Sequence, residues 1–348
     1  MWPYLIMLGL IFVPWLFIKK TKQNERRWLI YTWCILSLVE GLRAYSVGTD
    51  TSTYVQLFQT QNFRTMEVGY QWFTTVIGKI TENPTIYLLI VAFIINGLVI
   101  RAISILSKQP DVSVFAYISL YFYFNAFNGL RQYIAIALVL TAYCYIKEQK
   151  LVKAAVCELI AFSFHNSAII GLLLIPMYFI THRNESNTQT QTPKKYYFLN
   201  IILPLAFFFA FQYGFDAIYN MFLSYFPQYL IYEGRAAFSG TNAIQQKVVY
   251  TAIFLVYTLF CNDNEWTLML SYSVCLALMM SRIQMMSRFL WYYDIFSVFA
   301  IAEIWNSERF TRSSLKIVRI AIATVLLLFL LYYLSVGMMR VTPYKFAL

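Results

Sequence analysis

The sequence is poor in charge, in histidine and in paired cysteine. Only 12% of its 348 residues are charged and two are histidine, whereas 60% are hydrophobic and 19% aromatic. Its five cysteines lie in or beside apolar runs and form no Cys-x-x-Cys pair, so we expect neither a metal site nor a disulfide framework. The mean hydropathy of +0.58 makes the chain far more apolar than an ordinary soluble domain. The composition predicts a polytopic membrane protein.

Basic residues are absent before the first apolar run, residues 2–18, and a cluster of lysines and arginines follows it. This order is the reverse of a cleavable signal peptide, so we interpret the run as a retained span with its N-terminus outside. The net charge of +11 does not indicate nucleic-acid binding, because most basic residues fall in short loops between spans, where the positive-inside rule accounts for them.

The apolar runs predict an all-α fold, a single membrane domain over residues 1–348. A helix crossing the hydrocarbon core needs about 20 apolar residues, and fewer where it is short or buried among other helices. On this basis we expect a bundle of about twelve spans, at residues 2–18, 28–42, 85–100, 112–128, 132–146, 153–164, 167–180, 197–213, 248–261, 267–281, 289–305 and 319–336.

Several of these spans result from dividing a longer apolar run. Residues 112–146 would form a helix of roughly 50 Å, too long for a core of about 30 Å, and the polar segment Asn125–Gln132 interrupts them. The same length argument divides residues 267–305 at Arg282–Arg288. Both interruptions place polar residues at the predicted outer side.

Residues 153–180 divide at His165 and Asn166, because an undivided helix would put the last group of basic residues outside. Two predicted outer loops, 43–84 and 214–247, are long and rich in aromatic residues. An interfacial aromatic belt and the stacking of sugar rings both explain this composition. The inner loop at 181–196 is low in complexity and is predicted to be a flexible tether.

The segment Arg43–Tyr54 follows an apolar run and carries the chemistry that a phosphate ligand needs. Gly48 allows backbone N–H groups to approach a ligand closely, and Arg43 offers a planar fork of donors to phosphate oxygens. Asp50 is a candidate general base, and it is equally a candidate helix cap or arginine partner. Glu67 competes with Asp50 for the role of base.

Further arginines fall on the same predicted side of the membrane. Arg131 and Gln132 lie inside the broken apolar run, and ionisable groups at such depth usually line a cavity or pair with one another. Arg282 and Arg288 lie six residues apart, so a turn between them is needed to aim both inward. Arg235, like Arg43 and Arg340, is also explained by snorkelling to lipid head groups.

His165 lies at the end of an apolar run, in the sequence Phe-Ser-Phe-His-Asn-Ser. Its imidazole can serve as a general base or as an orienting donor, and a hydrogen-bonded structural histidine is the alternative. Together with the arginines, such a residue could bind a lipid diphosphate at the outer leaflet and assist glycosyl transfer. Negative charge grows on the diphosphate as the sugar leaves, and prepositioned guanidinium groups stabilise it.

Short motifs in a fixed order resemble the EpsG group of Wzy-type polysaccharide polymerases. They are Gly41-Leu42-Arg43, Val47-Gly48-Thr49-Asp50-Thr51 with Tyr54, Glu67-x-Gly69-Tyr70, Leu130-Arg131-Gln132 with Ile134-Ala135, Phe164-His165-Asn166-Ser167-Ala168, and Arg288 with Tyr292.

The resemblance implies a glycosyltransferase of the bacterial cytoplasmic membrane that joins undecaprenyl-diphosphate-linked oligosaccharide repeats of an O-antigen, capsule or exopolysaccharide. It implies no cofactor, neither a nucleotide sugar nor an obligatory metal, and partners among membrane lipids, flippase and chain-length regulator proteins. From their chemistry and their place on the predicted outer side, the catalytic candidates are Asp50, Glu67 and His165, and the candidates for binding substrate are Arg43, Gly48, Arg131, Gln132, Arg235, Arg282, Arg288 and Tyr292.

Two other functions fit the same composition. A flippase or transporter would move the lipid-linked sugar, but such proteins usually carry polar sites reachable from both faces. A membrane acyltransferase would modify the glycan, with His165 as its base.

Overall fold

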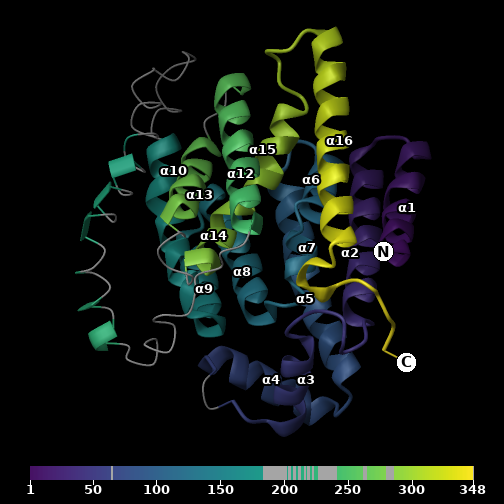
Figure 1. Cartoon of the computed structure of the whole chain (residues 1–348), viewed down its shortest axis with the longest axis vertical. Coiled ribbons are helices and arrows are strands. Elements are labelled where there is room, and N and C mark those ends of the chain that lie inside the picture. The colour runs from purple at the N-terminus through teal and green to yellow at the C-terminus, as the bar shows by residue number, and fades with distance from the viewer. Residues whose placement is uncertain are drawn as a thin grey trace.

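The computed structural model describes residues 1–63, 66–182, 241–261, 265–279 and 286–347, with scattered helical residues between 202 and 225. Over these residues the chain is helical and has no strand, so the all-α prediction is confirmed (Figure 1). The helices are α1 (Trp2–Phe17), α2 (Lys22–Gly41), α3 (Thr51–Thr60), α4 (Val68–Ile80), α5 (Pro84–Leu106), α6 (Pro110–Ser119), α7 (Phe122–Asn125), α8 (Leu130–Lys147), α9 (Leu151–Phe164), the 3-10 helix η1 (Asn166–Leu173), α10 (Leu174–His182), α12 (Thr241–Phe260), α13 (Thr267–Met279), α14 (Met286–Asp294), α15 (Ser297–Ile304), α16 (Arg312–Ser335) and the 3-10 helix η3 (Met338–Arg340).

Helix boundaries follow capping residues in the sequence. The hydroxyl of Thr21 accepts a hydrogen bond from the backbone N–H of Asn24 at the start of α2, and Thr311 does the same for Ser314 at the start of α16. Asn83 caps α5, which has Pro84 at its first position. These caps satisfy N–H groups that have no partner within the helix.

The predicted interruptions of long apolar runs are confirmed. Helix α7 ends at Asn125 and α8 begins at Leu130, and α9 ends before His165, which is extended with φ −157° and ψ 121°. Helices α13 and α14 are also separate, although the residues between them, Arg282 among them, lie outside those that the structure describes. At the first two of these places the chain turns round instead of continuing as one long helix.

Two predicted spans are broken further than the sequence indicated. Residues 112–128 were expected to form one helix, but α6 and α7 are separated at Tyr121, whose positive φ of 73° no α-helix accepts. Residues 289–305 were also expected to be continuous, but α14 and α15 are separated at Ile295 and Phe296. Both breaks lie in the buried centre of the bundle. Neighbouring helices there pack around the backbone groups that the breaks leave without a partner in their own helix.

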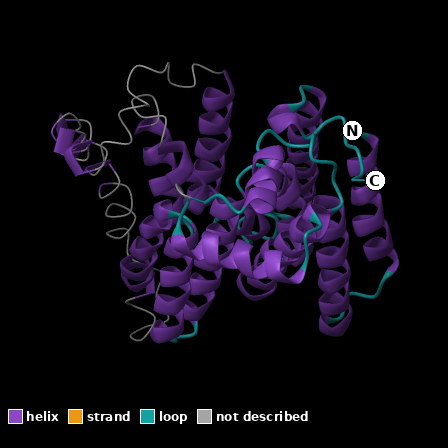
Figure 2. Ribbon diagram, turned by 90° about the horizontal axis from the view of Figure 1, so that it is seen from below, coloured by secondary structure: helices purple, strands orange, loops and turns teal. Residues whose placement is uncertain are grey.

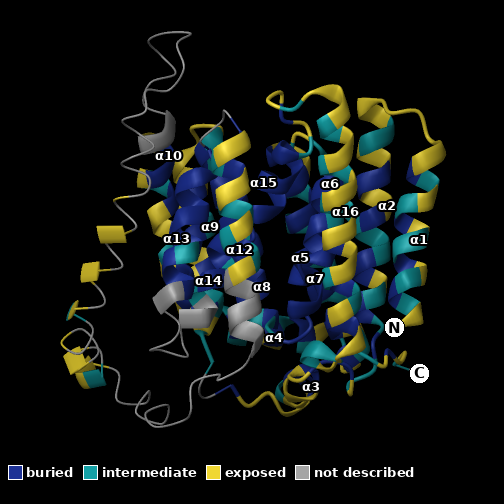
Figure 3. Ribbon diagram, turned by 45° about the horizontal axis from the view of Figure 1, so that its top comes forward, coloured by how far each residue is buried: buried dark blue, intermediate teal, exposed yellow. Residues whose placement is uncertain are grey.

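Several helices expose apolar side chains while their opposite faces are buried (Figure 3). On α1, Ile6, Leu10 and Val13 are exposed, whereas Met7 and Ile11 are buried. By length and hydropathy, Pro84–Leu106 and Arg312–Ser335 are long and apolar enough to cross a membrane, and four shorter apolar helices accompany them. Exposed apolar stripes of this extent are typical of surfaces covered by lipid. The number of spans and their orientation stay predictions.

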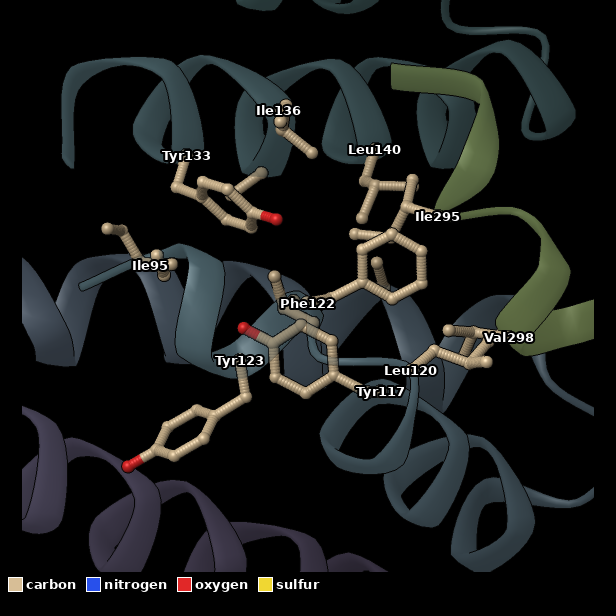
Figure 4. Packing of buried hydrophobic residues seen from close by; sticks show 14 of the residues in the cluster. Ile95, Tyr117, Leu120, Phe122, Tyr123, Tyr133, Ile136, Leu140, Ile295 and Val298 are labelled. Carbon is tan, nitrogen blue, oxygen red and sulfur yellow. The ribbon is translucent and has the colours of Figure 1, made fainter. Parts of the chain in front are cut away.

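The core of the molecule lies where α6, α7 and α8 meet (Figure 4). Tyr117, Tyr123 and Tyr133 are fully buried there. The hydroxyl of Tyr123 donates to the backbone carbonyl of Leu36 on α2 at 2.8 Å. This hydrogen bond holds the short helix α7 against α2, and so fixes the position of the residues that follow α7.

Helices α3 and α4 lie across one end of the bundle, and Figure 2 views the molecule from that end. The N-terminal helix and the C-terminal tail reach the same end, since the hydroxyl of Tyr4 donates to the backbone carbonyl of Val341 at 2.8 Å. We call this the motif end, defined by Arg43–Asp50, Glu67, Asn128, Arg131 and His165. The opposite end carries the ion pair of Lys147 with Glu265, at 2.5 Å.

The segment predicted as the first long outer loop, residues 43–84, contains the helices α3 and α4. The second predicted loop, 214–247, and the tether at 181–196 lie largely outside the described residues.

Candidate functional site

The turn between α7 and α8 holds the Arg43–Asp50 loop through main-chain and amide oxygens. The carbonyl of Phe127 accepts hydrogen bonds from Nη2 of Arg43 at 3.1 Å and from Oγ1 of Thr51 at 3.2 Å. The side-chain oxygen of Asn128 accepts from Oγ1 of Thr49 at 2.9 Å and from the backbone N–H of Asp50 at 3.2 Å. Two motifs that are about 80 residues apart in sequence thus form one structural unit.

Arg43 is buried inside this unit, with only 1% of its surface exposed. Its guanidinium donates to the carbonyls of Glu40 and Phe127 and to Oγ1 of Thr51, and it lies 4.6 Å from the ring centroid of Phe127. Because its donors face the protein, Arg43 does not offer them to a ligand in this structure. The contacts of Arg43 in this structure position the loop, and its direct contact with a diphosphate stays a prediction.

Gly48 is required by the backbone of the loop. Its φ of +101° is unfavourable for any residue with a side chain. A Cβ atom there would lie 2.5 Å from Oγ1 of Thr51 and 2.9 Å from the side-chain oxygen of Asn128. The glycine therefore permits the close approach of the loop to the α7–α8 turn.

Asp50 lies at the edge of the unit and is exposed. It occupies the N-cap position of α3, but its side chain makes no capping hydrogen bond. Among the described residues its carboxylate has no hydrogen-bond or ion-pair partner. Since no cation neutralises it and no donor occupies it, this carboxylate is available to accept a proton.

Arg131 and Glu67 form an ion pair that joins α8 to the start of α4. Both side chains are largely buried, with 16% and 13% of their surfaces exposed. The other oxygen of Glu67 accepts the backbone N–H of Asn166 at 3.4 Å, so one carboxylate connects Arg131 to the turn after α9. Arg131 Nε is buried and has no hydrogen-bond partner among the residues that the structure describes. This donor remains for a ligand oxygen, because an unsatisfied buried donor is costly.

The ring of Tyr70 lies beside Arg131, with the guanidinium carbon 5.7 Å from the ring centroid. Its hydroxyl is 2.9 Å from that of Tyr87. Burial raises the pKa of Tyr70 to about 12, so the phenol stays protonated at neutral pH. Tyr70 consequently supports the arginine and does not serve as a base.

His165 is buried at the turn after α9 and has a defined partner on one ring nitrogen. Nδ1 lies 2.5 Å from Oγ of Ser167 and accepts the backbone N–H of Ser167 at 3.3 Å. Oγ of Ser167 in turn donates to the hydroxyl of Tyr292 on α14 at 3.2 Å. The contacts with Ser167 hold the imidazole ring of His165 at this turn.

Of the remaining predicted site residues, the structure describes some fully and others in part or not at all. Gln132 is buried in the first turn of α8. Arg288 lies in the first turn of α14, one helical turn before Tyr292, and its side chain is outside those described. Arg235 and Arg282 fall in segments that the structure does not describe. Within the described segments, no three histidine, cysteine, aspartate or glutamate side chains form a group that could hold a metal ion.

Comparison of the whole sequence with known families gives a result that agrees with the motifs. The family profile of the EpsG family matches residues 26–346, which is most of the chain. The chain belongs to the EpsG family. No curated protein and no solved structure is significantly similar to it. Membership, with the helical and apolar architecture, identifies a membrane protein of polysaccharide biosynthesis with a polymerase-type function.

Two contributors to this EpsG-family site escaped prediction as site residues. Asn128 connects Thr49 and Asp50 to the α7–α8 turn, and the only signal was its place in the polar interruption of an apolar run. The C-terminal tail packs against the loop through backbone hydrogen bonds. Hydrogen bonds between main-chain groups leave no mark on side-chain composition, so no pattern in the sequence pointed to the tail.

Gly69 of the EpsG-family motif explains why α4 can approach α9 so closely. A Cβ atom at this position would lie 2.1 Å from Oγ and 2.8 Å from the carbonyl oxygen of Ser163. We expect Gly69→Ala to displace α4, to separate Glu67 from Arg131 and to reduce polymer by tenfold or more. Overpacking of this kind also costs about 1–3 kcal/mol of stability. Gel analysis of polymer and the Tm of purified protein measure both effects.

Gly9→Ala on α1 is the matched control, since no atom lies within 4 Å of a Cβ there. Ser163→Gly should restore part of the polymer made by Gly69→Ala, because it removes the clashing side-chain atoms. Wild-type polymer from Gly69→Ala alone would contradict the tight contact.

Proposed function

We propose that this EpsG-family protein is a polysaccharide polymerase at the outer face of the cytoplasmic membrane. It transfers the growing glycan from undecaprenyl diphosphate to the next lipid-linked repeat. The observation that carries the proposal is the arrangement at the α7–α8 turn. The backbone N–H of Asp50 donates to Asn128, and Arg131 lies three residues after Asn128 in the chain. Among the described residues, the carboxylate of Asp50 has no partner and Nε of Arg131 is a buried donor without an acceptor.

The reaction requires stabilisation of a leaving diphosphate. As the bond between the sugar C1 and the phosphate oxygen breaks, both electrons go to the diphosphate, whose negative charge grows. Arg131 is held by Glu67 and Tyr70 before substrate arrives, so its charge stabilises the leaving group without reorganisation. Arg288, in the first turn of α14, is proposed as a second cation for the same group.

The acceptor hydroxyl must lose a proton while its oxygen forms the new bond to C1. We assign this proton to Asp50, because its carboxylate is exposed and unpaired. Glu67 is less suited to this role, since its carboxylate is already paired with Arg131. His165, whose imidazole ring Ser167 holds in place, is proposed to orient the substrate. An oxocarbenium-like transition state follows by analogy with glycoside hydrolysis.

The substrate is amphipathic, and the exposed apolar helices suit its environment. The polyprenyl chain would lie in lipid along these helices, while the diphosphate reaches the motif end. Membrane lipids, a flippase that supplies the repeat and a chain-length regulator are the proposed partners. The donor and the acceptor are both lipid-linked repeats, so no nucleotide sugar is needed.

Deletion of the gene tests the proposal. We expect polymer to disappear while the single lipid-linked repeat accumulates at the outer leaflet, detected by gel analysis and by a membrane-impermeant sugar label. Purified protein with the lipid-linked repeat alone should then form polymer in vesicles. Accumulation at the inner leaflet would indicate a flippase instead. Unchanged chain length with loss of glycan acylation would indicate an acyltransferase.

A further inference from the structure

The C-terminal tail, residues 337–347, returns to the motif end after α16 and packs against the Arg43–Asp50 loop. An antiparallel β-bridge pairs Arg43 with Phe346. Four hydrogen bonds to main-chain carbonyls fix the tail, from Ala44 N to Lys345 O at 2.8 Å, from Ala347 N to Leu42 O at 2.8 Å, from the Tyr344 hydroxyl to Val39 O at 2.9 Å and from the Tyr4 hydroxyl to Val341 O at 2.8 Å.

Within the tail, two consecutive residues contact the Arg43–Asp50 loop and the α7–α8 turn that holds it. The carbonyl of Arg340 accepts the backbone N–H of Gly48 at 2.9 Å, and the carbonyl of Met339 accepts Nδ2 of Asn128 at 3.3 Å. Both residues have a left-handed backbone conformation, with φ of 57° for Met339 and 53° for Arg340. Residues with a Cβ adopt this conformation at a cost, and such strained residues gather at functional sites.

The side chain of Arg340 is not needed for these main-chain contacts. It is exposed, and its guanidinium makes no hydrogen bond or ion pair with any residue that the structure describes. Glycine or asparagine would occupy the same backbone conformation with less strain. An arginine in this conformation therefore suggests a use for its charge. The backbone hydrogen bond to Gly48 places the main chain of Arg340, from which this side chain extends, beside the loop that ends at Asp50.

We propose that Arg340 is a further phosphate-binding residue of the site, brought to the Gly48 loop by the C-terminal tail, and that it contacts the diphosphate of the lipid-linked glycan. The guanidinium matches phosphate oxygens with two parallel hydrogen bonds. This inference rests on the proposed function and deepens it. It adds a cation from the C-terminal end of the chain, in place of Arg43, whose donors are occupied within the protein.

The test measures binding of undecaprenyl diphosphate to the full-length protein in nanodiscs of phosphatidylcholine. Arg340→Gly removes the guanidinium and keeps the left-handed backbone, so the Tm should be unchanged or higher. We expect its Kd to rise at least about tenfold, the size of one charge-assisted contact. Arg340→Lys should bind more tightly than Arg340→Gly. Arg312→Gln, an equal loss of charge at an exposed position at the start of α16, should bind like the wild type.

Equal affinity of Arg340→Gly and the wild type would overturn the inference and leave the proposed function standing. An effect seen only when the nanodiscs contain phosphatidylglycerol would assign Arg340 to lipid head groups, and would also overturn it. Weaker binding with a lower Tm in both Arg340→Gly and Arg340→Asn would make the residue structural. If the wild type itself does not bind undecaprenyl diphosphate, the proposed function fails together with the inference.

Discussion

Arg131→Ala is expected to reduce polymer about 100- to 1000-fold while the protein level and the single lipid-linked repeat are retained. Removing one preorganised donor to a developing negative charge costs about 3–4 kcal/mol of transition-state stabilisation. Arg131 has the features of such a donor, because Glu67 and Tyr70 hold it and its Nε has no partner in the described part of the chain. Polymer from membranes with added lipid-linked repeat, quantified on gels, measures the loss.

Matched variants distinguish the effect of losing the charge of Arg131 from the effect of losing its ion pair with Glu67. Lys79→Ala removes an exposed cation from the last turn of α4 and should leave polymer unchanged. Glu67→Gln keeps the hydrogen bond from Asn166 and leaves Arg131 charged, so we expect a smaller loss than for Arg131→Ala. If Glu67 acts only through Arg131, the double variant should be no worse than Arg131→Ala. A wild-type ladder from Arg131→Ala would exclude Arg131 from the reaction.

Asp50→Asn is expected to reduce the polymerisation rate about 100- to 10,000-fold, the usual contribution of a general base. Asparagine is as good an N-cap as aspartate, and Asp50 makes no capping hydrogen bond, so α3 should be unaffected. The backbone N–H that donates to Asn128 is also retained. The rate with purified protein and lipid-linked repeat, together with the Tm, isolates the loss of the proton acceptor.

Binding distinguishes a base from a ligand contact. Asp50→Asn should bind undecaprenyl diphosphate at least as tightly as the wild type, because a negative charge near the diphosphate is removed. Loss of binding with loss of rate would instead make Asp50 part of the binding surface. Full activity of Asp50→Asn would transfer the role of base to Glu67, and Glu67→Gln would then have to show the larger effect.

Much of the site was predictable because its residues are polar where the sequence is otherwise apolar. Asn125–Gln132 interrupts an apolar run that is too long for one span, and Glu67 lies in a loop between two apolar helices. The same reasoning did not indicate the burial of Arg43, because an arginine at the end of a span suggests a ligand or a lipid head group. Whether a guanidinium faces outward or is saturated by main-chain carbonyls depends on Phe127 and Thr51, and only folding brings Phe127 to it.

The sequence by itself determined the helical class, the membrane environment and the positions of the main turns, because length, hydropathy and polar interruptions act locally along the chain. It also supplied the motifs that resemble the EpsG family. Only the tertiary structure decided which arginine keeps a donor free, which carboxylate is unpaired and that the C-terminal tail returns to Gly48. These properties depend on contacts between residues up to about 300 positions apart, and many of the contacts are made by backbone groups that every residue carries.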